Sequence, residues 1–210
     1  MTQSAALAGV FDELAPAYDH EHHEEVARAL LALTGPGPTA AVADVACGAG
    51  AVSLLLARHR PADAPPVLAV DVSPRMIETG RARAASSGVR RSAIDWRLAD
   101  AVPLPVADHC LDVVLCASSL HFLGGRAVAD WRRALRPGGR VGFTLPSATH
   151  FRPSARFRAL LAADVPLPRS AEEACAWAAA NGFTDAVSRV HVLGGRRVVV
   201  TSAVRPAGRP

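Results

Sequence analysis

The most conspicuous absence from this 210-residue chain is lysine: its 23 basic residues are all arginine, against 19 acidic residues, which gives a formal net charge of +4. The arginines are spread from Arg28 to Arg209 rather than clustered. A nucleic-acid interface needs positive charge concentrated on one face, so this spread argues against a nucleic-acid partner. GC-rich coding is a simpler explanation of an arginine-only, alanine-rich composition.

Paired cysteines and long apolar runs are also missing. The four cysteines, none of them in a Cys-x-x-Cys pair, are Cys47, Cys110, Cys116 and Cys175. This predicts a reduced, cytoplasmic protein. The N-terminal segment MTQSAALAGVFDELAPAYDH has neither the basic nor the apolar region of a secretory signal, and no run of about 18 apolar residues follows. We therefore expect neither secretion nor membrane insertion.

From residue 39 onward, short apolar runs alternate with amphipathic stretches, which predicts an α/β fold with a parallel sheet covered by helices. The expected strands are residues 41–46, 67–70, 93–98, 111–117, 140–145, 184–192 and 197–204. The expected helices of this region are residues 51–59, 74–86, 126–135, 154–163 and 171–181. The Gly-Gly turn between the last two strands favours a β-hairpin.

The chain is long enough for one substantial core and short for two, so we expect a single main domain. Residues 1–38 are expected to form an N-terminal helical lid, which ends at the breaker Gly-Pro-Gly-Pro of residues 35–38. Residues 39–204 would form the main domain, and residues 205–210 a frayed tail.

A glycine turn follows the first expected strand and opens the next helix. Gly48 and Gly50 would let the backbone pass close to a bound nucleotide-like ligand, where a Cβ would clash. A dinucleotide-binding fingerprint would require a third glycine at position 53, where this chain has Ser53. The alternative is a tight turn that binds no ligand.

Three acidic residues are expected near the carboxyl ends of neighbouring strands: Asp44, Asp71 and Asp100. Open α/β sheets bind ligands at this edge, and Asp71 lies 21 residues after Gly50, where an acid can bind both ribose hydroxyls. The alternative for Asp71 is an ordinary acid at a helix start. Together the acids suit a cationic, hydroxylated, amino-bearing ligand, and they would repel a pyrophosphate.

With these residues the chain resembles the class I S-adenosylmethionine-dependent methyltransferases, and among them the ubiquinone/menaquinone type, over residues 10–204. Five segments carry the resemblance in order. They are FDELAPAYD (11–19), the glycine motif VADVACGAG (42–50), the ribose motif LAVDVSPRM (68–76), the adenine motif LADAVPLP (98–105) and the turn LRPGG (135–139).

The resemblance implies a Rossmann-like, doubly wound, seven-stranded sheet, mostly parallel with an antiparallel C-terminal hairpin strand. It also implies S-adenosyl-L-methionine as cofactor and S-adenosyl-L-homocysteine as product. The residues that it places around the cofactor are Ala46, Gly48 and Gly50 at the methionine and ribose, Asp71 at the ribose, Val72 and Met76 at the adenine faces, Asp100 and Ala101 at the adenine edge, Ala117 at the methionine, and Tyr18 closing over the site.

Methyl transfer is an in-line displacement, so the protein mainly positions the nucleophile and needs a base only if the acceptor loses a proton. His121 follows the fourth strand, at a place that faces the transferred methyl group in this fold, and is the first candidate base. Its alternative role is a polar cap that packs on the strand end. Tyr18 is the second candidate catalytic residue.

Two other groups of polar residues have weaker functional interpretations. His20, His22 and His23 lie among glutamates, but no single helical face collects three ligands, so we expect a solvated helix start and no metal. His150 and Arg152 follow the fifth strand and could contact an anionic substrate.

The expected acceptor is a small molecule, because the extension and inserts are short. A DNA amino-methyltransferase would carry an Asn/Asp-Pro-Pro-aromatic tetrad after the fourth strand, where this chain has Ala-Ser-Ser-Leu at 117–120. We expect carbon or oxygen methylation of a phenolic, quinol or polyketide-like compound, by a monomer or homodimer. The alternatives are an S-adenosylmethionine-binding protein that catalyses a different reaction and an NAD-dependent oxidoreductase.

Overall fold

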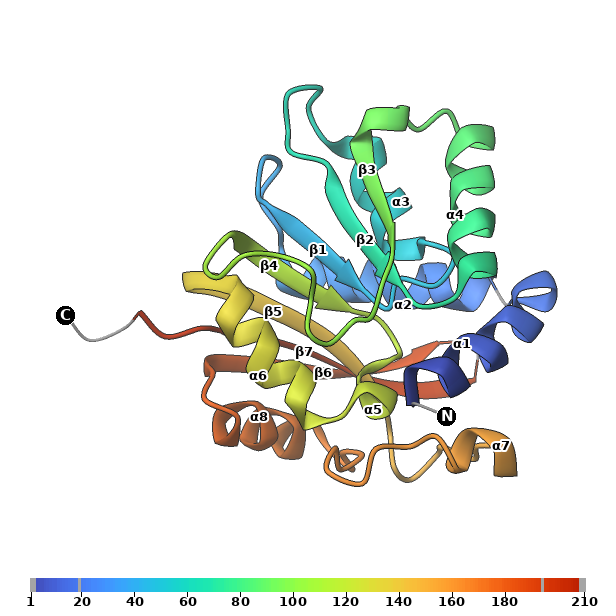
Figure 1. The fold of residues 1–210 in the computed structure, drawn as a ribbon. Coiled ribbons are helices and arrows are strands. Elements are labelled where there is room, and N and C mark those ends of the chain that lie inside the picture. The colour runs from blue at the N-terminus through green and yellow to red at the C-terminus, as the bar shows by residue number, and fades with distance from the viewer. Residues whose placement is uncertain (1–2, 19, 194, 208–210) are drawn as a thin grey trace.

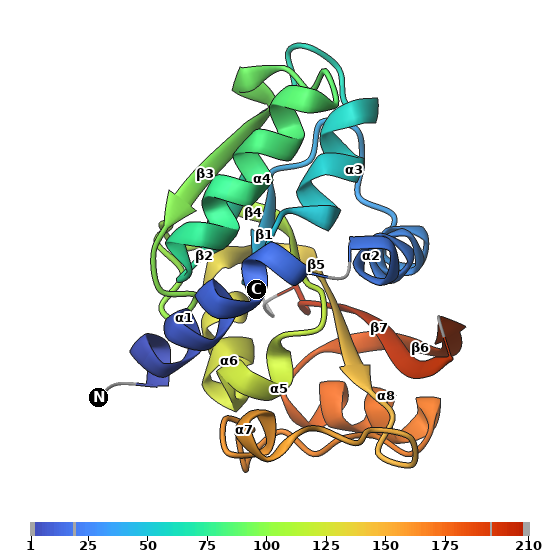
Figure 2. The ribbon, with the colours of Figure 1, turned by 90° about the vertical axis from the view of Figure 1, so that its right-hand side faces the viewer.

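The computed structural model describes residues 3–18, 20–193 and 195–207. One sheet of seven strands runs through the molecule, and helices cover both of its faces (Figure 1, Figure 2). The strands are β1 (Val42–Val45), β2 (Val67–Asp71), β3 (Ile94–Leu98), β4 (Leu111–Cys116), β5 (Leu135–Pro146), β6 (Thr184–Leu193) and β7 (Arg196–Val204). The α-helices are α1 (Gln3–Leu14), α2 (His20–Thr34), α3 (Ala51–His59), α4 (Pro74–Ser86), α5 (Leu120–Leu123), α6 (Gly125–Ala134), α7 (Ala155–Arg158) and α8 (Ala171–Ala180). Two short 3-10 helices are η1 (Ala15–Ala17) and η2 (Arg91–Ala93).

The strand order is β3-β2-β1-β4-β5-β7-β6. The first five strands pair in parallel, and β7 is antiparallel to both β5 and β6. This confirms the predicted Rossmann-like sheet with an antiparallel C-terminal hairpin. The chain moves outward from β1 to β3 and then returns to the other side of β1 as β4. A crevice forms at such a reversal, beyond the carboxyl ends of the strands.

The core consists of two layers of side chains, one on each face of the sheet. On one face Val45, Val114 and Phe143 pack with Trp131 of α6 and its neighbours. On the other face the strands pack against α2, α3 and α4. Every residue of β1 and β2 is buried, as expected for parallel strands that are covered on both sides.

The N-terminal helices occupy two different places. Helix α2 packs on α3, β5 and β7, and its residues Val26, Ala27 and Leu30 are fully buried. Helix α1 lies across the carboxyl edge of the sheet, next to α5 (Figure 2). None of the described helices combines the length and the apolar character needed to cross a bilayer.

Two elements differ from the sequence-based prediction. The helix expected at residues 154–163 is only the short α7, where the Ser154 side chain accepts a hydrogen bond from Phe157 N. Strand β5 begins at Leu135 instead of residue 140, because Leu135 already pairs with Leu111 and a bulge follows. The Pro-Gly-Gly segment that suggests a turn therefore lies within the strand, with Gly138 at a φ of +79°.

Candidate functional site

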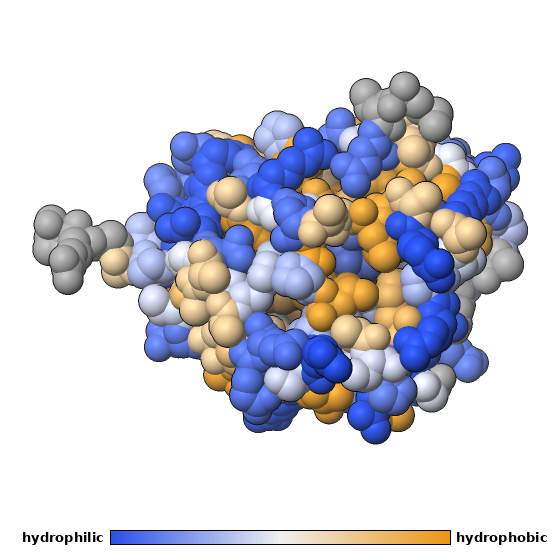
Figure 3. All heavy atoms as spheres, turned by 90° about the horizontal axis from the view of Figure 1, so that it is seen from below, coloured by the Kyte–Doolittle hydropathy of each residue, from blue (hydrophilic) through white to orange (hydrophobic). Residues whose placement is uncertain are grey.

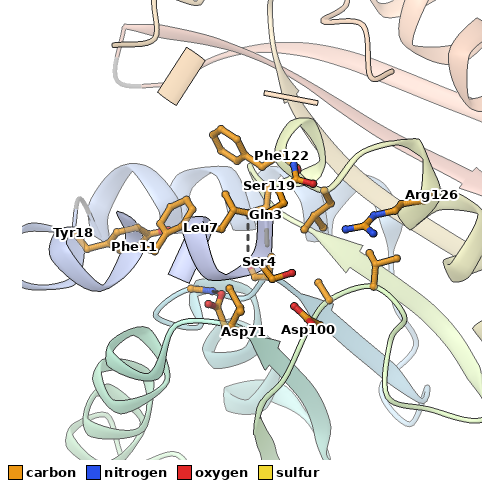
Figure 4. Close-up of a pocket in the computed structure, with 16 residues that line it drawn as sticks. Gln3, Ser4, Leu7, Phe11, Tyr18, Asp71, Asp100, Ser119, Phe122 and Arg126 are labelled. Carbon is orange, nitrogen blue, oxygen red and sulfur yellow. Dashed lines mark hydrogen bonds between the residues drawn. The ribbon is translucent and has the colours of Figure 1, made fainter. Parts of the chain in front are cut away.

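A pocket lies at the carboxyl edge of the sheet, where the strand order reverses (Figure 4). Its floor consists of the turns after β1, β2 and β3, that is residues 46–50, 71–73 and 100–101. Its roof consists of α1 and α5, which line the pocket, and of α7, which packs on them through Phe157. Tyr18 and Arg126 lie towards opposite ends of the pocket in Figure 4, with Asp71 and Asp100 between them on the floor.

The structure brings most of the predicted cofactor residues together. Those that line the pocket are Tyr18, Ala46, Gly48, Asp71, Val72, Asp100 and Ala101. They come from four separate parts of the sequence and meet because the parallel strands all end at the same edge. Asp19 of the N-terminal signature lies outside the described residues.

The two glycines of the turn face different neighbours. Gly48 has a φ of +53°, and a Cβ there would lie 3.0 Å from Tyr18 Oη, on the pocket side. Gly50 has a φ of +77°, but a Cβ there would overlap the indole of Trp96 on β3. Gly80 of α4 adjoins the same indole. Gly48 therefore lines the pocket beside Tyr18, whereas Gly50 makes room for Trp96.

Asp71 is the best-defined polar group of the floor. Its Oδ2 accepts a hydrogen bond from Gly48 N (2.7 Å), and its Oδ1 accepts one from Ser73 N (2.8 Å). Asp71 is only 6% exposed. Burial raises the pKa of Asp71 above its usual range, and the two backbone N–H groups oppose that rise. These bonds fix the carboxylate at the pocket edge.

Asp44 does not line the pocket with Asp71 and Asp100, the other two acids that were expected at the strand ends. It is buried beneath the turn, where its Oδ2 accepts hydrogen bonds from Ser53 N (3.1 Å) and Ser53 Oγ (2.7 Å). Burial raises the pKa of Asp44 to about 7, against the effect of these bonds. Ser53 occupies the position of the missing third glycine and ties the first turn of α3 to β1.

Three other predicted cofactor residues do not line the pocket. Gly50 faces Trp96, as described above. Met76 is fully buried in a cluster with Ala15 and Ala49, and Ala117 packs against the core layer under α2 and α3. Their contact with the cofactor stays a prediction.

Tyr18 closes one end of the pocket. Its ring stacks on His23 of α2, with 4.3 Å between the ring centroids. Burial and the negative charge of Asp71 raise the pKa of the Tyr18 phenol well above its usual range. Tyr18 is therefore a hydrogen-bond donor at neutral pH rather than a base.

His121 lies in α5 among aromatic rings, behind the pocket wall rather than on it. It is 5% exposed, and its ring centroid is 4.1 Å from that of Phe122 and 5.7 Å from that of Phe151. Its Nδ1 has no hydrogen-bond partner among the described residues. Burial lowers the pKa of His121 to about 4, so its imidazole is neutral at pH 7.

The other polar candidates do not line the pocket. His22 and His23 are in α2, and no three His, Cys, Asp or Glu side chains form a metal-binding group within the part of the chain that the structure describes. The His20 side chain lies outside that part. His150 and Arg152 are exposed in the segment after β5, where His150 Nδ1 is 2.7 Å from Thr149 Oγ1.

The roof contributes residues that the sequence analysis missed. From α1 and α5 they are Gln3, Ser4, Leu7, Phe11, Phe122 and Leu123, and from other segments Val102, Ser119 and Arg126. Four of them share one face of α1, and their helical spacing is a signal that could have identified them: Gln3, Ser4, Leu7 and Phe11. No comparable pattern marks the residues after β4.

Aromatic side chains hold the roof together. Phe11 of α1, Phe122 of α5 and Phe157 of α7 form a triangle with centroid separations of 5.9 to 6.2 Å. Gln3 Nε2 donates to the Phe122 carbonyl oxygen (2.8 Å). Figure 3 views the molecule from the side of α7 and α8, and apolar side chains gather near its middle between hydrophilic ones. The contacts between the three helices of the roof are thus mainly apolar.

Known proteins resemble this chain in the region that builds the pocket floor. Residues 42–139 match the model of a methyltransferase domain. The chain is 36% identical over 140 residues to the ubiquinone/menaquinone biosynthesis C-methyltransferase UbiE of Acidiphilium cryptum (strain JF-5), which covers 62% of this chain and 55% of that protein. It is 35% identical over 142 residues to the nocamycin O-methyltransferase of Saccharothrix syringae, covering 65% and 50%. The chain thus spans about half the length of these relatives.

Solved structures share the fold at low sequence identity. A SAM-dependent methyltransferase from Aquifex aeolicus has a TM-score of 0.63 at 18% identity, covering 85% of this chain and 89% of that one. The [4+2]-cyclase SpnF has a TM-score of 0.68 at 18% identity, covering 88% and 81%. The methyltransferase-domain match over residues 42–139, the motifs on the floor and the shared fold together support a class I S-adenosylmethionine-dependent methyltransferase.

Proposed function

We propose that the chain transfers a methyl group from S-adenosylmethionine to carbon or oxygen of a small phenolic, quinol or polyketide-like acceptor. The observation that carries the proposal is the meeting of Gly48, Asp71 and Asp100 at the strand-order reversal. The names of the two relatives above, a ubiquinone/menaquinone biosynthesis C-methyltransferase and a nocamycin O-methyltransferase, support a small-molecule acceptor and leave the methylated atom open.

The floor suits a positively charged nucleoside. Asp71 presents a fixed carboxylate for two ribose hydroxyls, and Asp100 lies further along the floor, where it can accept from an adenine amino group. Gly48 lines the pocket, and a Cβ there would crowd the hydroxyl of Tyr18 at 3.0 Å. Two carboxylates on one floor attract a sulfonium and repel a pyrophosphate, which favours this cofactor over NAD.

The bound cofactor would supply an electrophilic methyl group, and the protein's own task is to position the acceptor and keep water out. We assign this task to the roof. Leu7 and Phe11 of α1 and Phe122 of α5 give the pocket an apolar wall opposite the acids. A flat, apolar acceptor can pack on such rings, which agrees with a phenol or quinol.

His121 is the proposed proton acceptor for an acceptor that must lose a proton. Its neutral imidazole has an unpaired Nδ1 and lies directly behind Phe122. Because it lies behind the pocket wall, this role requires the acceptor or Phe122 to open a path to the ring. Tyr18, which stays protonated, is proposed to donate a hydrogen bond at the other end of the pocket.

The test begins with calorimetric titration of the purified protein with S-adenosylmethionine and, separately, with NADH. We expect binding of the first alone. Incubation with methyl-labelled cofactor and a panel of phenols, hydroquinones and hydroxylated polyketides should then transfer label and release S-adenosylhomocysteine. Consumption of an acceptor without S-adenosylhomocysteine would instead identify a protein that binds the cofactor for another reaction. No binding of the cofactor would refute the proposal.

A further inference from the structure

Asp12 joins the roof to the floor. It lies in the last turn of α1, one residue after the pocket-lining Phe11. Its Oδ1 accepts hydrogen bonds from Ser73 Oγ (2.6 Å) and from Arg75 N (3.2 Å), both at the start of α4. The first N–H groups of a helix have no partner within the helix, and a carboxylate is a favourable partner there. Asp12 thus caps α4 from a different helix.

Ser73 connects Asp12 to the proposed ribose-binding group. Its backbone N–H donates to Asp71 Oδ1 (2.8 Å), while its hydroxyl donates to Asp12 and accepts from Met76 N (3.1 Å). Ser73 is fully buried, so water cannot replace these partners. The position of Asp12 therefore determines how firmly the Ser73 N–H, and through it the Asp71 carboxylate, is held.

The arrangement places a second negative charge close to Asp71. Two carboxylates flank one serine, and the negative charge of Asp12 adds to the effect of burial on the Asp71 pKa. Glu13, the next residue of α1, pairs instead with Arg156 of α7 (2.6 Å) on the surface. Adjacent acids of α1 thus make different connections, one to the floor and one within the roof.

We propose that Asp12 is a positioning residue for the cofactor, which acts through Ser73 to orient Asp71 and docks the lid helix α1 on the same turn. The inference rests on the proposed ribose contact of Asp71. It makes cofactor binding and the seating of α1 mutually dependent: a ribose held by Asp71 stabilises the turn that holds α1, and a seated α1 stabilises the turn that holds the ribose.

The experiment is calorimetric titration with S-adenosylhomocysteine of the wild type, Asp12→Ala, Asp12→Asn, Asp71→Ala, the double variant Asp12→Ala/Asp71→Ala and the matched control Glu13→Ala. We expect Asp12→Ala to weaken binding about tenfold, because it releases a buried hydroxyl and a helix N–H. Asp12→Asn keeps an oxygen in the same place and should stay within about twofold of the wild type. Glu13→Ala, which cuts only the surface pair, should do the same.

The double variant distinguishes a positioning role from general support of the fold. If Asp12 acts through Asp71, the double variant binds no more weakly than Asp71→Ala alone, whereas independent effects multiply. If the affinity losses of the two single variants multiply in the double variant, or if Asp12→Ala binds as tightly as the wild type, the coupling of Asp12 to Asp71 is overturned. The assignment of the cofactor site is not affected by either result. Unchanged binding in Asp71→Ala would overturn the ribose contact and the coupling together. The Asp12→Asn variant keeps the cap of α4, so its recovery of affinity tests the role even where Asp12→Ala is unstable.

Discussion

The floor and the roof of the pocket are built by different interactions. On the floor, Gly48 and Ser73 donate backbone hydrogen bonds to the two oxygens of one carboxylate. In the roof, three phenylalanine rings meet at about 6 Å, and one surface ion pair and one hydrogen bond from the Gln3 side chain complete the contact. The floor is specified atom by atom, whereas the roof is specified mainly by apolar volume.

This difference predicts which substitutions affect the proposed cofactor site and which affect the proposed acceptor site. The Asp71 carboxylate, which we propose binds two ribose hydroxyls, tolerates little change, because the loss of a charge-assisted hydrogen bond in a buried place is costly. Packed rings can be exchanged for other apolar side chains of similar volume. We therefore expect changes in the floor to affect stability and cofactor affinity, and changes in the roof to affect the acceptor and turnover.

The largest effect is expected from Gly50→Ala in the floor. The substitution combines a φ of +77° with overlap of the new Cβ and the Trp96 indole, which should lower the unfolding free energy by about 3 to 4 kcal/mol. Urea denaturation measures it. The matched control is Gly138→Ala, which has a φ of +79° but no atom within 4 Å of the new Cβ, and should lose only about 1 kcal/mol. Equal losses of unfolding free energy in the two variants would show that the overlap with Trp96 does not contribute.

A pH-dependent effect is expected from Asp44 beneath the floor. Its pKa is raised to about 7 in the folded chain, so between about pH 4 and pH 7 the native state holds a proton that the unfolded state has already released. The stability that this group contributes is therefore lost as the pH rises from about 4 to about 7, and the loss is complete above the folded pKa. Asp44→Asn should remove the loss, and the difference in unfolding free energy between wild type and variant should change by about 2.5 kcal/mol from pH 5 to pH 8. Parallel pH profiles would contradict it.

Asp71→Ala tests the floor as a cofactor site. Loss of a buried, charge-assisted acceptor should weaken S-adenosylmethionine binding by about 1.5 to 3 kcal/mol, which is roughly 10- to 150-fold. Calorimetry measures the dissociation constant. Asp95→Ala on the neighbouring strand β3 is the control, because Asp95 forms an exposed pair with Arg97 outside the pocket. An effect of the same size in both variants would point to general electrostatics rather than a ribose contact.

The smallest effect is expected behind the roof, from His121→Phe. The substitution replaces one aromatic ring by another, so cofactor affinity should stay within about twofold of the wild-type value. Turnover should fall about tenfold, below the usual effect of a general base, because a pKa near 4 makes a weak one. The wild-type rate should show no inflection near pH 6.5 from this group. Unchanged turnover would return His121 to a packing role.

The sequence predicted the sheet and much of the floor because both depend on local patterns. Buried strands read as apolar runs, and Gly48, Asp71 and Asp100 follow strands whose ends meet. Gly50 and Asp44 share those motifs, but their neighbours Trp96 and Ser53 direct them away from the pocket. Such partners depend on packing between segments distant in sequence.

The roof was less accessible to prediction for a related reason. The ring contacts among α1, α5 and α7 join residues up to 146 positions apart, and no spacing rule connects them. The short α7 was expected to be a longer helix because its composition suits one, yet the chain turns after Arg158 to pack beside His121, whose carbonyl oxygen accepts from Ala162 N (2.8 Å).

Tyr18 is the chain's single tyrosine, and its hydroxyl lies over Gly48 at the end of the pocket. Biosynthetic incorporation of 3-fluorotyrosine would therefore place one fluorine nucleus in the whole molecule, beside the glycine turn. The fluorine NMR spectrum would consist of signals from this place alone, and their number and exchange would report how the pocket opens and closes in solution.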